Sequence, residues 1–142
     1  MRPHILVLSV ATLSCVSACD LRPQSSHGFR LPDGDPDHGK QVFIEMQCAS
    51  CHAVADDETL REGVEPEMTV IIGGMATRVD TYGELVTSVI NPSHRIARSY
   101  RNEEFSEDGG SKMRNYNDVL TVTEMIDLVA FLQDQYTEFP DY

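Results

Sequence analysis

The sequence predicts an all-α fold of three to five short helices. Three segments, at about 35–47, 81–90 and 121–136, place apolar residues at spacings of three and four, which is the helical period. No segment alternates apolar and polar residues convincingly, so no strand is expected. The stretches between these segments contain glycine, proline and charged residues, which is typical of loops.

The N-terminus is predicted to be an export signal. Arg2 precedes an apolar stretch at 5–18 that is too short to serve as a permanent membrane span. The residues Val16-Ser17-Ala18-Cys19 are similar to the bacterial lipobox, in which the chain is cleaved before a cysteine that then carries lipid. An ordinary signal peptide is the alternative. The lipoprotein interpretation places the mature chain, anchored through Cys19, on the periplasmic side of a bacterial membrane.

Three units follow from this interpretation: a signal peptide at 1–18, a flexible tether at 19–35 and a folded domain at 36–142. The tether is rich in Pro, Gly, Ser and charged residues and shows no helical or strand period. The loss of Arg2 with the signal changes the net charge from −12 to −13. Such acidity disfavours nucleic acid and anionic lipid as partners, and it favours a partner with a basic surface or a salty or alkaline habitat.

The first and second helices have recognisable ends. Asp35 is expected to cap the first helix, with Pro36 in its first turn. The second helix begins near Thr81 and ends at Asn91-Pro92, because the residue before a proline disfavours the helical conformation. The apolar face of the first helix consists of Gly39, Val42, Phe43 and Met46.

The last helix shows the clearest pattern. Thr121 and Glu124 have the spacing of a capping box, and Leu128, Phe131 and Leu132 repeat at helical spacing behind them. The polar, glycine-containing stretch at 101–118 before it is expected to be a loop.

The five residues Cys48-Ala49-Ser50-Cys51-His52, directly after the first helix, have the spacing of a c-type haem attachment site. In such a site two thiols add to the two vinyl groups of haem, and the adjoining histidine ligates the iron. Cys15 leaves with the signal and Cys19 takes the lipid, so the motif holds the remaining thiols and one haem c is expected. A zinc site or a thioredoxin-like redox pair are weaker alternatives, because each needs a setting that the sequence does not show.

A sixth iron ligand must come from elsewhere in the chain. Met113 is the favoured candidate, because it lies in the loop between a Gly-Gly pair and the last helix and can reach the open haem face. A methionine packed on the core is the alternative reading of this residue. The other candidates are Met46, Met68, Met75, Met125 and His94.

Taken in order, these parts resemble the class I monohaem cytochromes c, of the bacterial lipoprotein type, over about residues 36–137. Gly39 and Phe43 match a Gly-x-x-x-aromatic helix face of that family. The segment Leu128-Val129-Ala130-Phe131-Leu132 is similar to the C-terminal helix that crosses it. The resemblance implies a cytochrome c fold around one covalently attached haem.

The same resemblance implies site residues. His52 and Met113 would be the axial ligands, and the carbonyl of Pro66 would accept a hydrogen bond from the proximal histidine. Arg114 departs from the family, which usually has proline after the distal methionine, and it is expected near the haem edge as a lone positive charge.

A haem with both axial positions filled has no place for oxygen or a substrate. We therefore expect one-electron transfer rather than catalysis, with redox proteins as partners. Two alternatives stay open: an electron-transfer subunit of a larger oxidoreductase or oxidase complex and, less favoured, a haem sensor or enzyme with a labile sixth ligand.

Overall fold

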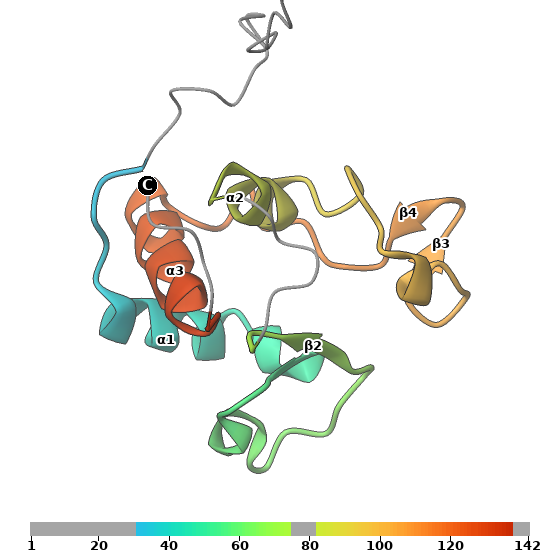
Figure 1. Cartoon of the computed structure of the whole chain (residues 1–142), viewed down its shortest axis with the longest axis horizontal. Coiled ribbons are helices and arrows are strands. Elements are labelled where there is room, and N and C mark those ends of the chain that lie inside the picture. Colours follow the sequence, from blue (N-terminus) through green and yellow to red (C-terminus); the bar gives the residue numbers. More distant parts are fainter. Residues whose placement is uncertain (1–30, 75–81, 138–142) are drawn as a thin grey trace, which may run out of the picture.

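The computed structural model describes residues 31–74 and 82–137 (Figure 1). The predicted signal, the lipidated Cys19, most of the tether and Met75 lie outside these residues. Among the described residues, no helix is long and apolar enough to cross a membrane. The helices of the described part are α1 (Pro36–Glu45), η1 (Cys48–Ser50), η2 (Glu58–Arg61), α2 (Tyr82–Ile90), η3 (Arg98–Tyr100) and α3 (Val122–Asp134), where η marks a 3-10 turn.

The predicted helix ends agree with the structure where it describes them. The side chain of Asp35 accepts hydrogen bonds from the N–H groups of Asp37 and His38 and so caps α1. Thr121 and Glu124 form the capping box of α3. Thr81, near which the second helix is expected to begin, lies outside the described residues.

The expectation that the chain has no strands is wrong in detail. Strand β1 (His52–Val54) pairs in parallel with β2 (Val70–Ile72), and β3 (Ser106–Glu107) pairs in antiparallel fashion with β4 (Gly110–Ser111). Each strand has two or three residues, which is too short for an alternating pattern to be visible. The sheets are small additions to a helical core, so the all-α class still describes the fold.

Among the described elements, the closest packing lies between α1 and α3. A Cβ added to Gly39 would collide with the backbone of Asp127 and lie 2.8 Å from the Cβ of Phe131. The rings of Phe43 and Phe131 fill the space beside this contact, with centroids 5.5 Å apart. The predicted close approach of the two helices at Gly39 is therefore confirmed (Figure 1).

Residues 31–35, which the sequence assigned to the tether, pack against the domain. The N–H of Leu31 donates to the hydroxyl of Tyr82 at 3.0 Å, and the N–H of Asp35 donates to Oδ1 of Asp127 at 2.8 Å. Gly34 lies against α3, since an added Cβ would sit 2.7 Å from the carbonyl oxygen of Ile126. Within the described part of the chain, residues 31–35 are therefore packed against the domain.

Candidate haem site

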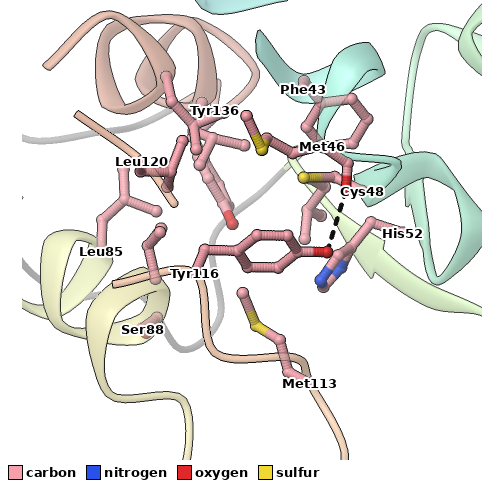
Figure 2. A pocket seen from close by; sticks show the side chains of 14 residues that line it. Phe43, Met46, Cys48, His52, Leu85, Ser88, Met113, Tyr116, Leu120 and Tyr136 are labelled. Carbon is pink, nitrogen blue, oxygen red and sulfur yellow. Dashed lines mark hydrogen bonds between the residues drawn. The ribbon is translucent and has the colours of Figure 1, made fainter. Parts of the chain in front are cut away.

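An apolar pocket lies between α1, the turn after it, α2, the segment before α3, and α3 itself (Figure 2). Its space is about 630 Å³ when the part open to solvent at its mouth is included. Aliphatic and aromatic side chains supply most of its wall: Phe43, Ile72, Leu85, Val89, Leu120, Leu128 and Leu132.

The two cysteines of the motif lie on one tight turn, and of the two only Cys48 lines the pocket. Gln47 adopts a left-handed conformation with φ 57° that ends α1, and η1 then brings the N–H of Cys51 to 3.1 Å from the carbonyl oxygen of Cys48. Neither thiol forms a disulfide, and Cys48 lines the pocket. Burial raises the pKa of the Cys48 thiol to about 11, opposite to the lowered pKa of redox-active thiols. This environment suits a neutral thioether better than thiol redox chemistry.

His52 lines the same pocket and is set up as a neutral imidazole. Burial lowers its pKa below the usual value; the nearby backbone of Val70 opposes this shift, and the positive charge of Arg61 adds to it. Its Nδ1 atom is buried and has no hydrogen-bond partner among the described residues. A neutral imidazole is the form that ligates a metal.

Met113 lines the pocket from the segment before α3, far from the haem motif in the sequence. Its side chain is half-buried and lines the pocket, and its N–H donates to Oγ of Ser111 at 3.1 Å. Figure 2 shows Met113 and His52 extending into the pocket from different segments. The structure thus brings together Cys48, His52 and Met113, three of the residues that the sequence singled out.

The competing ligands are less well placed. Met46 also lines the pocket, but it directly precedes Gln47 and the motif. Met125 is buried in the core, and His94 is exposed with its Nδ1 2.8 Å from the carbonyl oxygen of Asn91. Met68 is half-buried but does not line the pocket. Within residues 31–74 and 82–137 no group of three or more His, Cys, Asp or Glu could hold a metal ion, so this part offers no zinc site.

A family model for cytochrome c matches residues 36–135. The chain belongs to the cytochrome c family. Comparisons with curated proteins and with solved structures gave no match. Members of this family bind haem c covalently and typically carry electrons rather than catalyse a reaction.

The residues of this cytochrome fit such a group. Two thiols one turn apart and a half-buried neutral imidazole beside them are the donors that a c-type haem requires, and a thioether in the same apolar pocket is one of the sixth ligands that such haems use. Cys48, Cys51 and His52 would hold the haem on one side, and Met113 would be a donor on the other.

Pro66 does not take the position predicted for it. It is exposed, and the hydrogen bond to Nδ1 of His52 is not formed in this structure. The reason is the register of the parallel pair, which sets Val70 opposite His52 and so brings Val70 beside the ring. The N–H of Glu67, the residue after Pro66, donates to the carbonyl of Ser50 at 2.9 Å. The backbone at this point is therefore bonded to the haem motif itself.

Arg61 is a structural residue of the site that sequence reasoning missed. Its Nε donates to the carbonyl of Ala49, inside the haem motif, at 3.0 Å. Its two terminal nitrogens donate to Oγ1 of Thr69 at 3.1 Å and to the carbonyl of Met68 at 3.0 Å. Arg61 therefore joins the motif to the segment that enters β2, and a lone arginine in an acidic loop gives no sign of this role.

Tyr116 and Arg114 were not predicted in the positions that they occupy. The hydroxyl of Tyr116, which lines the pocket, donates to the carbonyl of Met46 at 3.0 Å (Figure 2). Arg114 is not a lone charge, because it forms an ion pair with Glu67 at 2.8 Å.

Proposed function

We propose that this cytochrome carries single electrons through one haem c, with His52 and Met113 as its axial ligands. The observation that supports this most is that the two side chains, far apart in the sequence, line one apolar pocket beside Cys48. Haem c supplies the one-electron oxidation and reduction of iron. With His52 and Met113 both bound, the iron would have no site left for a substrate, and the methionine sulfur would favour the ferrous state.

The protein part of the mechanism is to exclude water and to hold the donors. The aliphatic wall keeps the dielectric constant around the site low, which raises the reduction potential. The bonds from Arg61 to the motif and to the segment before β2 keep the turn in place. These features suit a carrier whose geometry changes little when it gains or loses an electron.

We further propose that its partners are redox proteins with basic docking surfaces. The loop that follows the haem motif exposes a run of acidic side chains, and such a field steers a positively charged partner toward the site. This run consists of Asp56, Glu58, Glu62 and Glu65.

Electron exchange with small inorganic oxidants tests both statements. The reduced haem-loaded protein should give up one electron per chain. Its oxidation by a cationic complex should slow as salt is added, because screening weakens attraction, and oxidation by an anionic complex should quicken. Transfer of more than one electron would contradict the single-haem carrier, and an inverted salt dependence would contradict the docking surface.

The lipid anchor is a separate proposal, supported by the lipobox-like residues before Cys19. It would hold the cytochrome at the periplasmic side of a bacterial membrane. We expect Cys19→Ser to move the protein from the membrane fraction to the soluble fraction, provided that the altered signal is still cleaved. Retention of a cleaved Cys19→Ser protein in the membrane would contradict the anchor.

A further inference from the structure

The Met113 segment, defined here as residues 111–117, is attached to the α2 side of the pocket at both ends. The N–H of Ser111 donates to Oγ of Ser93, just after α2, at 3.0 Å. At the other end, Nδ2 of Asn117 donates to the carbonyl of Ile90, the last residue of α2, at 2.9 Å. These two bonds place the segment beside α2, but they do not hold it toward His52.

Two further bonds from the same segment reach across to the His52 side. The hydroxyl of Tyr116 donates to the carbonyl of Met46, at the end of α1 and close before the haem motif. The guanidinium of Arg114 pairs with the carboxylate of Glu67, in the loop after the motif. The two bonds span 70 and 47 residues of sequence and lie on either side of the motif in the chain.

The other bonds of the Met113 segment do not connect it to the His52 side, since the N–H of Met113 donates to Oγ of Ser111 within the same segment. Arg114 has no ring to fix its φ angle, so the conformation of the segment depends on its contacts. Its pocket contacts come from the half-buried side chains of Met113 and Tyr116. Both bonds that reach the opposite half come from residues just after Met113, and they would therefore limit how far its sulfur can withdraw.

We propose that Tyr116 and Arg114 are positioning residues that hold Met113 at the haem and so limit the access of outside ligands to the iron. This inference rests on the proposed His52–Met113 ligation. Tyr116 makes the stronger and salt-independent contribution, because its hydroxyl and its acceptor lie in a partly buried place. The Arg114–Glu67 pair is exposed, with 55% and 52% of the two side chains accessible, so salt should weaken it.

Imidazole binding to the oxidised haem-loaded protein measures this access. An outside ligand that binds only when Met113 has withdrawn has an apparent affinity proportional to the fraction of open molecules. Loss of one hydrogen bond in Tyr116→Phe should raise the imidazole affinity by about two- to tenfold at any salt concentration. Arg114→Gln should raise it by about fivefold or less at low salt, with no change at high salt.

Matched controls come from η3, the turn that precedes β3 and β4. Tyr100→Phe and Arg98→Gln remove the same groups from η3, outside the set of pocket-lining residues, and should leave the affinity unchanged. A variant that is merely less stable would show a lower midpoint of denaturant unfolding without tighter imidazole binding. Unchanged imidazole affinity in Tyr116→Phe would overturn the inference for Tyr116.

If Tyr116→Phe does not take up haem, a double-mutant cycle on Arg114 and Glu67 tests the inference instead. Arg114→Gln and Glu67→Gln should each raise the low-salt affinity, and the double variant should raise it no further than one of them does. Wild-type affinity in all three would overturn the inference. Met113→Ala separates this outcome from a failure of the proposed ligation: imidazole must bind it more tightly than wild type, and equal binding would mean that Met113 is not the ligand.

Discussion

His38 and Asp127 form an ion pair where α1 meets α3, with 2.8 Å between Nδ1 and Oδ2. The hydrogen bond to Asp127 raises the pKa of His38 above 6.5, and the nearby carboxylates of Asp35 and Glu124 add to this. The pKa of Asp127 is lowered below 3.8, first by the hydrogen bond from the backbone of Asp35 and then by His38. The pair thus couples the stability of the helix crossing to pH.

The sign of this coupling follows from the two shifts. A raised pKa means that protonated His38 stabilises the fold fully below about pH 6.5 and that this contribution is lost as the pH rises through the folded value. Asp127 contributes above about pH 3.8, and its contribution is lost as the pH falls through its lowered folded value. We therefore expect His38→Gln to reduce the free energy of unfolding most between about pH 4 and 6.5. Denaturant unfolding at a series of pH values measures this, and a difference that stays constant from acid to alkaline pH would contradict it.

Among single residues, those whose role follows from local spacing were predictable. Cys48, Cys51 and His52 are adjacent in the chain, so their joint chemistry is visible in the sequence. Arg61 and Tyr116 act through distant backbone carbonyls, those of Ala49, Met68 and Met46. Every residue has such a carbonyl, so nothing in the sequence indicates which one an arginine or tyrosine will reach.

At the scale of elements, the crossing of α1 and α3 has the strictest requirement. Alanine is a better helix former than glycine, so an unhindered Gly→Ala change in a helix would stabilise it. At Gly39, however, the new methyl group would collide with the backbone of Asp127, and a backbone cannot rotate away as a side chain can. The sign of the effect at Gly39 therefore reports on the crossing itself.

We expect Gly39→Ala to lower the free energy of unfolding by about 1–3 kcal/mol or more, the usual cost of overpacking a well-packed contact. Equilibrium unfolding in denaturant measures it. Gly110→Ala is the matched control, because an added Cβ there meets nothing closer than 3.5 Å and little change is expected. A Gly39→Ala protein as stable as wild type would show that the helices do not approach as closely as described.

The elements differed in how well the sequence predicted them. The caps and the faces of α1 and α3 were readable because capping residues and apolar spacing act within one or two turns. The strands were not predicted from the sequence, although the turn between β3 and β4 carries a recognisable sequence pattern. Asp108 and Gly109 both have positive φ, 50° and 80°, and Asp-Gly is a frequent pair in tight hairpin turns. The β1–β2 pair has no such sequence pattern, because a long irregular segment separates its two strands.

At the scale of the whole molecule, the pocket depends on contacts between segments that are far apart in the sequence, and the sequence alone does not show which segments meet. The order of the motifs was enough to indicate the cytochrome c family, which the match over residues 36–135 confirms. It was not enough to place Pro66, since the register of β1 with β2 decides which residue lies beside His52. Nor could it show that Glu67 would neutralise Arg114 across 47 residues.

The proposed electron carrier depends on Met113 as the second axial ligand of the iron. The far-red absorption of the oxidised, haem-loaded protein tests this most directly, because methionine–iron ligation gives a charge-transfer band there. Met46→Leu provides the matched control, since Met46 lines the same pocket without being the proposed ligand. We expect the band in the wild type and in Met46→Leu and its loss in Met113→Ala. Absence of the band from the wild type, or its persistence in Met113→Ala, would contradict the His52–Met113 assignment.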